Sequence, residues 1–334
     1  MKNYAIIGFG GMGKTHFQHL RQLEEKRGDI QLVAICNSDI ESITKNISLN
    51  FGNVNMSDID FSRYGLYTDY KEMLEKEKID FVFISLPSYL HAEVSIYCLN
   101  HGVDVFTEKP MAITLEQCTA MMEAAKNNGR RLMVGQVLRF ISEYKFLKDA
   151  VDTKKYGKAV KAEFYRKSAL PAWSFGNWML KEDKSGGCVV DMHVHDVDMM
   201  VWLFGKPSNI SILSTHQKAE FESVFGLYQY PELAVQIVGD WGLPATFAFE
   251  TGYSVTFEKA LIEYKNNKLK VYTDEKSEEV SLNESNGHYE EIEEFVRAVV
   301  DGEALVTVDT QSVYETMEVV FAEKKIAKDG VIGR

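Results

Sequence analysis

The chain has 334 residues and carries 37 basic against 49 acidic side chains, which gives a formal net charge of −12. Hydrophobic residues make up 45% and charged residues 26% of the sequence, a globular composition that excludes an intrinsically disordered chain. The length predicts two domains, and the acid surplus argues against nucleic acid or an anionic membrane surface as a partner, because both are negatively charged.

Short β-branched runs alternate with longer helical patterns from residue 1 to about residue 135. This alternation predicts a parallel sheet with helices on both faces, and therefore a doubly wound α/β domain over residues 1–135. The expected strands are Tyr4–Ile7, Gln31–Cys36, Asp80–Leu86, Val103–Phe106 and Arg131–Val134, and the expected helices are Met12–Glu25, Leu90–Asn100 and Leu115–Asn127.

The pattern changes after residue 135, where several adjacent strand-like runs are flanked by helices. This order predicts an α+β domain over residues 136–334 with a large, mainly antiparallel open sheet. The expected strands are Ala159–Tyr165, Ile210–Ser214, Ser223–Gln229, Ala234–Trp241, Thr246–Glu250 and Ser254–Phe257, and the expected helices are Ser142–Val151, Cys188–Phe204, Tyr289–Asp301 and Thr310–Lys328.

The cysteines and the apolar runs bear on the cellular compartment of the protein. The four cysteines show no C-x-x-C pairing, which favours buried reduced thiols over a disulfide framework or a zinc site. No apolar run approaches the ~20 residues that a membrane-spanning helix needs, and the N-terminus carries no secretory signal pattern. We therefore expect a soluble cytoplasmic protein.

A glycine-rich turn, Gly8-Phe9-Gly10-Gly11-Met12-Gly13, directly follows the first predicted strand and opens the first predicted helix. In this G-x-G-x-x-G pattern Gly8 makes a tight turn, Gly10 lets the backbone approach a pyrophosphate, and Gly13 allows the helix to pack closely on the strand. The helix N-terminus adds free N–H groups and a positive dipole end. These residues are therefore predicted to bind a dinucleotide.

The end of the second predicted strand bears on which dinucleotide is bound. An acidic residue there normally binds the adenosine ribose hydroxyls and favours NAD. This chain has Asn37 and Ser38 at that place, and no arginine is nearby to bind a 2′-phosphate; Lys45 is the nearest cation. Asn37 and Ser38 are expected to contact the cofactor, and the choice between NAD and NADP stays open.

A Glu108-Lys109-Pro110 turn follows the strand Val103–Phe106, at the carboxyl edge of the predicted sheet. Ligands bind at this edge in open α/β sheets. Pro110 restricts the preceding residue to extended conformations, which fixes the direction of Lys109. Lys109 could then hydrogen-bond a substrate hydroxyl beside the cofactor; the alternative is a surface lysine paired with Glu108.

Leu86 and Pro87 occupy the equivalent place on the neighbouring strand, followed by His91 at the start of a helix. Pro87 is expected to shape a backbone turn against the nicotinamide ring. His91 fits a cofactor contact and a capping or packing histidine equally well. Leu86, Pro87, His91, Glu108 and Lys109 are therefore predicted cofactor contacts at this edge.

A polar stripe marks the predicted helix Cys188–Phe204, which is otherwise apolar. Asp191, His195 and Asp198 recur at i, i+4 and i+7 and so share one face. A substrate pocket with a histidine general base and an orienting carboxylate would explain them, and a buried hydrogen-bond network is the alternative. A metal site of His193 and His195 is disfavoured, because residues two apart on a helix point in different directions.

Together these segments resemble the Gfo/Idh/MocA family of NAD(P)-dependent oxidoreductases over nearly the whole chain. The resemblance rests on the Gly8–Gly13 turn, the Glu108-Lys109-Pro110 turn, Arg139-Phe140 and the segment Gly186–Asp198. It implies an N-terminal Rossmann domain that binds NAD or NADP. It also implies a C-terminal domain whose open sheet often forms the oligomer interface, here of a homodimer or homotetramer.

The resemblance further implies a catalytic trio of Lys109, Asp191 and His195. His195 would take the proton from a substrate hydroxyl, Lys109 would hold and polarise the same oxygen, and Asp191 would orient the substrate or the histidine. The reaction implied is hydride transfer between the nicotinamide and a secondary alcohol or ketone of a sugar, cyclitol or related polyol. Arg139 is expected to contact the nicotinamide ribose or an acidic substrate group, and Trp178, with Trp173 nearby, is expected to line the substrate region unless it packs in the interior.

Two other functions remain open. Some proteins of this fold are cofactor-sensing regulators without turnover, and others are glycosidase-like enzymes that use tightly held NAD for transient oxidation. The presence of Lys109, Asp191 and His195 favours an enzyme over a regulator. Net reduction of added cofactor separates a dehydrogenase from the glycosidase-like enzyme.

Overall fold

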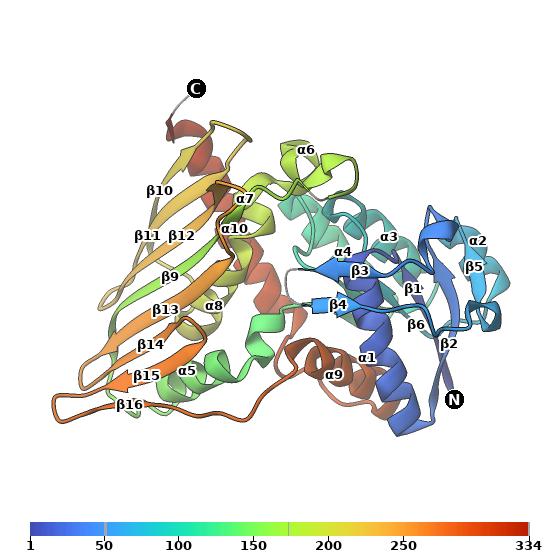
Figure 1. The fold of residues 1–334 in the computed structure, drawn as a ribbon, viewed down its shortest axis with the longest axis horizontal. Helices are drawn as coiled ribbons and strands as arrows, with labels where there is room; N and C mark the ends of the chain where they lie inside the picture. Colours follow the sequence, from blue (N-terminus) through green and yellow to red (C-terminus); the bar gives the residue numbers. More distant parts are fainter. Residues whose placement is uncertain (50–51, 173, 333–334) are drawn as a thin grey trace. The chain divides into compact units, whose positions relative to one another are not determined.

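The computed structural model describes residues 1–49, 52–172 and 174–332. The chain forms two compact units, Met1–Val137 with Asn286–Thr310 and Leu138–Ser285 with Gln311–Arg334. Figure 1 draws the elements of both units, coloured along the sequence. The segment Asn286–Thr310 returns to the first unit and brings helix α9 (Gly287–Asp301) with it. A single boundary near residue 135 does not capture this return.

Among the described residues of the first unit, six parallel strands form one sheet in the order β5-β2-β1-β6-β7-β8. This arrangement confirms the predicted Rossmann-type sheet. The chain order reverses between β1 and β6, and ligands bind at such a switch point in this fold class. The elements are β1 (Lys2–Ile7), α1 (Gly11–Arg27), β2 (Ile30–Cys36), η1 (Ile40–Ser42), β3 (Ile47–Leu49), β4 (Gly52–Val54), η2 (Phe61–Arg63), β5 (Gly65–Tyr67), α2 (Tyr70–Lys76), β6 (Phe81–Ile84), η3 (Ser88–Leu90), α3 (His91–Asn100), β7 (Asp104–Thr107), α4 (Leu115–Asn127), β8 (Leu132–Val134) and η4 (Val137–Phe140).

An aromatic core explains why α9 belongs to the first unit. Phe295 of α9 packs edge-on against Phe83 of β6 and Phe106 of β7, with ring centroids 5.5 and 5.8 Å apart. All three side chains are fully buried. Aromatic side chains of this size contribute large apolar areas to a core. The C-terminal segment therefore completes the core of the Rossmann sheet.

Within the described part of the second unit, nine strands form a sheet in the order β16-β15-β14-β13-β9-β12-β11-β10-β17. Most neighbours are antiparallel, while β9–β12 and β10–β17 are parallel, which confirms the predicted mainly antiparallel sheet. The elements are α5 (Ser142–Asp152), β9 (Ala159–Ala169), η5 (Phe175–Leu180), α6 (Glu182–Ser185), α7 (Gly187–Asp191), α8 (Val194–Phe204), β10 (Asn209–Thr215), β11 (Ser223–Gln229), β12 (Ala234–Leu243), β13 (Glu250–Phe257), β14 (Leu261–Lys265), β15 (Lys268–Tyr272), β16 (Ser277–Glu279), α10 (Thr310–Asp329) and β17 (Val331–Ile332).

Two predictions for the second unit are wrong in detail. The expected strand Thr246–Glu250 is mostly a turn and irregular chain, because Pro244 ends β12 and Glu250 begins β13. The expected single helix Cys188–Phe204 is divided into α7 and α8 at Met192 and His193.

None of the helices in the described ranges is long and apolar enough to cross a membrane.

The division of the helix is a widened turn. The His193 N–H donates to the carbonyl of Cys188, five residues earlier, at 2.8 Å. Such π-type turns are common at functional sites, since they let a helix change the direction of its side chains. Asp191 therefore ends α7 and His195 lies in the first turn of α8, so the two residues do not share one regular helical face.

Buried arginine–aspartate pairs anchor α8 in the second unit. Arg139 donates from Nε and Nη2 to Asp198 at 2.9 and 2.7 Å, and Arg166 of β9 donates from Nε to Asp196 at 2.9 Å. Thr316 of α10 also donates to Asp198, at 2.9 Å. All four charged side chains are at most 5% exposed. Bidentate pairs of this kind fix both position and orientation, so α8 is held from two sides.

A second buried cluster lies between α10 and the sheet. The His193 Nε2 atom lies 3.0 Å from the Tyr228 hydroxyl and 3.5 Å from Glu323 Oε2, and all three residues are at most 2% exposed. Burial raises the pKa of Glu323 to about 8, although a hydrogen bond with Tyr228 opposes the shift. Burial also lowers the pKa of His193, to about 3. Both side chains are therefore neutral near pH 7.

The pairing of Arg139 with Asp198 makes a prediction for stability. Arg139→Met leaves the Asp198 carboxylate buried without its cation, and breaking one side of a buried ion pair costs about 3–5 kcal/mol. The double variant Arg139→Met/Asp198→Leu removes both charges and should recover most of this loss. Urea unfolding measures both free energies, and an Arg139→Met loss below about 1 kcal/mol would contradict a structural pair.

The raised pKa of Glu323 makes a prediction for the pH dependence of unfolding. The folded protein holds this proton up to about pH 8, whereas an unfolded glutamate releases it near pH 4.3, so stability falls as the pH rises between these values. At pH 7 this costs about 3 kcal/mol. Glu323→Gln should therefore raise the melting temperature strongly at pH 8 and much less at pH 5. Glu318→Gln, at a partly exposed position on the same helix, is the control. If Glu323→Gln changed the melting temperature equally at pH 5 and pH 8, the account would be contradicted.

Candidate functional site

The glycine-rich turn lies at the carboxyl end of β1, at the switch point of the sheet. Gly8 has a φ of +89°, and a Cβ atom there would lie 2.5 Å from the Ser85 carbonyl oxygen. A Cβ on Gly13 would lie 2.0 Å from the Gly8 carbonyl oxygen, so α1 packs on the turn as predicted. Only glycine fits at these two positions.

The start of α1 has the properties of an anion site. A Cβ on Gly10 would meet nothing within 4 Å, no side chain caps the helix there, and no acidic residue lies in the first turn. Gly10 is exposed, while Gly11 and Met12 are partly exposed. The unpaired N–H groups and the positive end of the helix dipole favour a phosphate at this place. The residues therefore fit the pyrophosphate of a dinucleotide.

Phe9 and Asn37 were expected to contact the cofactor, but the structure gives both an internal role. The Phe9 ring is 1% exposed and packs against Phe17 and Phe61. The Phe9 N–H donates to Asn37 Oδ1 at 2.9 Å. The Asn37 amide in turn donates to the Asp39 carbonyl at 2.8 Å. Asn37 thus fastens the glycine-rich turn to the end of β2, and the exposed Ser38 is the remaining candidate there.

Lys14 was not predicted and helps to shape this region. Its side chain is 3% exposed, and Nζ donates to the carbonyls of Ser42 and Lys45 at 2.8 and 2.5 Å. Burial lowers the pKa of Lys14, and the charge of Lys45 adds to the shift. The loop after β2 is therefore tied to α1 by a buried ammonium group. The Gly13-Lys14-Thr15 sequence gave no signal of this contact, because its partners are backbone atoms.

The turns after β6 and β7 carry the other predicted cofactor contacts. Leu86, Pro87 and Lys109 are partly exposed at this edge and stay available to a ligand. His91 is 1% exposed, with Nδ1 2.8 Å from the Pro110 carbonyl and Nε2 2.8 Å from the Leu86 carbonyl. Both ring nitrogens face backbone carbonyls inside the protein, which is the capping or packing role that the sequence also allowed. The contact of His91 with the cofactor stays a prediction.

The Glu108 side chain also points inward, and its predicted contact with the cofactor stays a prediction. Its Oε1 atom lies 2.6 Å from His16 Nε2 on α1, and the carboxylate is only slightly exposed. Burial by itself would raise the pKa of Glu108, but the hydrogen bond and the charge of His16 outweigh it and lower this pKa to about 2. The two side chains therefore form a buried hydrogen-bonded pair around an ionised Glu108.

A neighbouring pair on α9 completes this cluster. His288 Nδ1 lies 3.0 Å from Glu291 Oε1. Burial opposes a charge on His288, but the bond to Glu291 prevails and raises the pKa of the imidazole, while burial raises the pKa of Glu291. Ligand atoms of His16, Glu108 and Glu291 lie within 4.8 Å of one another, close enough to share a metal ion. Each carboxylate already has a histidine partner in the structure.

The second unit carries Asp191 and His195 at the break between α7 and α8. Asp191 is 4% exposed and His195 is partly exposed. Trp178 lies in η5 and is partly exposed, whereas Trp173 lies outside the described residues. His193, which was considered together with His195 as a metal ligand, is buried and contacts Tyr228 instead.

Arg139 does not have the role that the sequence suggested. It was expected at the nicotinamide ribose or at an acidic substrate group, but it is fully buried and paired with Asp198, and Nη1 donates to Ser312 at 2.8 Å. The third residue of the polar stripe, Asp198, is therefore structural, as the alternative of a buried network proposed. Sequence alone could not pair residues that lie so far apart in the chain.

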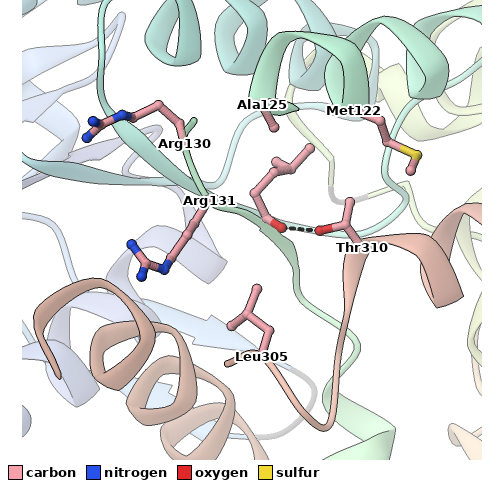
Figure 2. A pocket seen from close by; sticks show the side chains of 7 residues that line it. Met122, Ala125, Arg130, Arg131, Leu305 and Thr310 are labelled. Atoms are coloured by element: carbon pink, nitrogen blue, oxygen red, sulfur yellow. Dashed lines mark hydrogen bonds between the residues drawn. The ribbon is translucent and has the colours of Figure 1, made fainter. Parts of the chain in front are cut away.

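A hollow of about 200 Å³ lies elsewhere in the first unit (Figure 2). Its lining comes from α4, the start of β8 and the chain after α9, where the Thr310 hydroxyl donates to the Leu132 carbonyl. Figure 2 shows the guanidinium ends of Arg130 and Arg131 turned away from Thr310. This hollow lies at the amino end of the parallel strands, whereas ligands of this fold bind at the carboxyl end.

Comparisons with known proteins agree with this geometry. Residues 2–136 match the family model described as an oxidoreductase family with an NAD-binding Rossmann fold, and residues 144–277 match the GFO/IDH/MocA C-terminal domain. An inositol 2-dehydrogenase of Salmonella typhimurium is 27% identical over 205 residues, which cover 60% of this chain and 54% of that protein. A D-glucoside 3-dehydrogenase of Escherichia coli is 28% identical over 258 residues, covering 76% of this chain and 66% of that protein.

A solved structure extends the likeness of the fold to the whole chain. The myo-inositol 2-dehydrogenase of Lactobacillus plantarum superposes with a TM-score of 0.79 at 24% identity, over 99% of this chain and 98% of that chain. In sequence, by contrast, the chain spans about half the length of the Salmonella relative. The two matched domain models and the shared fold lead to one conclusion: this chain belongs to the Gfo/Idh/MocA oxidoreductase family.

Proposed function

We propose that the protein is an NAD(P)-dependent oxidoreductase that transfers hydride between the nicotinamide and a secondary alcohol or ketone of a sugar, cyclitol or related polyol. The observation that carries this proposal is the uncapped, glycine-lined start of α1 at the switch point of a Rossmann sheet. The named relatives act on an inositol and on a glucoside, which supports the substrate class.

The proposed catalytic residues are Lys109 of the first unit and Asp191 and His195 of the second. In the oxidative direction a dinucleotide held at the start of α1 would supply the acceptor for the hydride of the carbinol carbon. His195 takes the hydroxyl proton, so the alcohol loses two electrons and two hydrogens and becomes a ketone. Lys109 donates a hydrogen bond to the same oxygen and stabilises its developing negative charge. Asp191 orients the imidazole or the substrate.

The cofactor would be held mainly by backbone. Gly10, Gly11 and Met12 offer N–H groups to the pyrophosphate, and Leu86 and Pro87 shape the edge near the nicotinamide. Ser38 is the exposed side chain beside the ribose position, and no carboxylate comes directly after β2 to exclude a 2′-phosphate. Both NAD and NADP therefore stay within the proposal, and a comparison of their dissociation constants decides between them. Trp178 is proposed as an apolar wall of the substrate region.

We also propose that the sheet of the second unit pairs with a second copy of this chain in a homo-oligomer. Leu213, Phe225 and Leu227 are 52%, 43% and 59% exposed on β10 and β11. Leu213 and Phe225 are directly opposite each other, Phe225 is opposite Val238 of β12, and Leu227 lies two residues beyond Phe225 on the same face of β11. These neighbouring apolar side chains form one row. An exposed row of large apolar side chains on a sheet is typical of an interaction surface.

The catalytic proposal predicts a separation of turnover from cofactor binding. Lys109→Met and His195→Asn should each lower kcat by roughly 100-fold or more, because general acid–base catalysis and charge stabilisation contribute about that much each. The dissociation constant of the dinucleotide should stay within a few-fold, since backbone groups bind the phosphates. The test is steady-state kinetics on a substrate found by thermal shift with a panel of sugars and cyclitols.

The same assay separates the alternatives. A regulator would bind the dinucleotide without turnover of any panel member, and a glycosidase-like enzyme would release product without net reduction of added cofactor. Wild-type rates in both Lys109→Met and His195→Asn would remove the proposed catalytic roles.

The interface proposal predicts a change in oligomeric state. Leu227→Glu should shift the protein toward monomer in sedimentation velocity, because a charge in a closely packed apolar interface has no partner. Gln229→Glu adds the same charge on the same strand face, outside the row, and should leave the assembly intact. An unchanged sedimentation coefficient for Leu227→Glu would contradict the proposed interface.

A further inference from the structure

Lys109 is flanked on its N-terminal side by a residue with a buried anchor. Glu108 accepts the Lys109 N–H at Oε2, at 3.2 Å, while its Oε1 atom lies 2.6 Å from His16 Nε2. His16 is fully buried in the second helical turn of α1, the helix that the glycine-rich segment opens. The backbone of Lys109 is therefore linked to the helix that the proposed dinucleotide site uses.

The C-terminal side of Lys109 is anchored in a similar way. Pro110 has no N–H, and its carbonyl oxygen lies 2.8 Å from His91 Nδ1. The other ring nitrogen of His91 lies 2.8 Å from the carbonyl of Leu86, in the turn after β6. His91 therefore connects the two turns that form the carboxyl edge of the sheet. Lys109 is partly exposed between two neighbours that are buried.

The surroundings make these anchors rigid. A charge-assisted hydrogen bond between buried groups is stronger than one in water, and leaving either partner buried alone is costly. The rings around His16 are close-packed: its centroid lies 5.5 Å from that of Phe106 and 6.1 Å from that of His288. Glu108 cannot move outward without exposing His16, and Pro110 cannot move without breaking its contact with His91.

We propose that His16 and His91 are positioning residues for Lys109, and that through Glu108 and Pro110 they hold its backbone in the geometry that catalysis needs. This inference rests on the proposed catalytic function of Lys109. It assigns to the two histidines an effect on kcat, not on dinucleotide affinity. A misplacement of about 1 Å in a catalytic group can lower a rate by about 100-fold, so the anchors are long-range determinants of turnover.

The test is a double-mutant cycle between His16 and Lys109. His16→Leu removes the donor to Glu108 and should lower kcat by roughly 30-fold or more, while the dinucleotide dissociation constant stays within a few-fold. His16→Gln keeps an N–H donor near the position of Nε2 and should recover most of the rate. In the Lys109→Met background, His16→Leu should change kcat by less than about 3-fold, since effects that act through one residue are not additive.

A purely structural role of His16 gives a different result. The loss from His16→Leu would then be the same in the wild-type and Lys109→Met backgrounds, and this outcome would overturn the proposal. Leu23→Ala, a buried change on the same helix, controls for lost stability and should lower the melting temperature without a comparable loss of kcat. If Lys109→Met itself kept the wild-type rate, the proposed function would fail, which is a distinguishable result.

His91 provides a second, independent arm. His91→Asn keeps an N–H donor near the position of Nδ1, which faces Pro110, and His91→Leu does not. The first variant should therefore keep kcat near the wild-type value, and the second should lower it. The same double-mutant cycle with Lys109→Met applies, and this pair of variants decides the question if His16→Leu does not fold. Equal rates for His91→Asn and His91→Leu, or additive losses with Lys109→Met, would show that His91 does not act through Lys109.

Discussion

The constraint on which the rest of this structure depends is that an ionised side chain can be buried only with a partner. The leading buried charges here pair across elements far apart in the sequence: His16 of α1 with Glu108 after β7, Arg166 of β9 with Asp196 of α8, and Arg139 with Asp198. Such pairs contribute modest net stability but strongly resist the loss of one partner. They therefore fix the elements next to the proposed catalytic residues, while Lys109 and His195 stay partly exposed.

The same constraint separates residues that touch ligands from residues that hold them. Sequence patterns place both kinds at one sheet edge or on one helix, and burial tells them apart. At the edge of the first unit, Lys109 is accessible, whereas its neighbour Glu108 faces inward. On α8, His195 is partly exposed, whereas Asp196 and Asp198 each accept hydrogen bonds from a buried arginine. At both proposed catalytic positions, a partly exposed side chain thus lies beside a buried neighbour that is held by a partner.

Much of the fold could be predicted from the sequence, because its signals are local. The parallel sheet follows from strand–helix alternation, and the glycine-rich turn follows from the tight packing at Gly8 and Gly13. The short strand Gly65–Tyr67 was missed, since three residues carry no period. The return of α9 to the first unit was also missed, because its cause is the contact of Phe295 with Phe83 and Phe106, which no local pattern records.

The candidate site was predictable by residue type and less so by role. The glycines and Lys109 lie at the expected edge, but the inward roles of Phe9, Asn37, His91, Glu108 and Arg139 depend on partners elsewhere in the chain. The division of the helix at His193 was not predictable either, since a π-type turn changes one hydrogen bond without changing the apolar pattern. Long-range pairing is the information that a single sequence lacks.

The central claim is that this chain oxidises a polyol by hydride transfer with His195 as the base. The most direct measurement mixes the enzyme and dinucleotide with a cyclitol or sugar substrate, protiated or deuterated at the reacting carbon, and follows reduced nicotinamide in a single turnover. The account predicts slower reduction with the deuterated substrate, and in His195→Asn a rate of reduction at least about 100-fold lower than in the wild-type protein. Equal rates for both substrates and an unaltered rate in His195→Asn would contradict it.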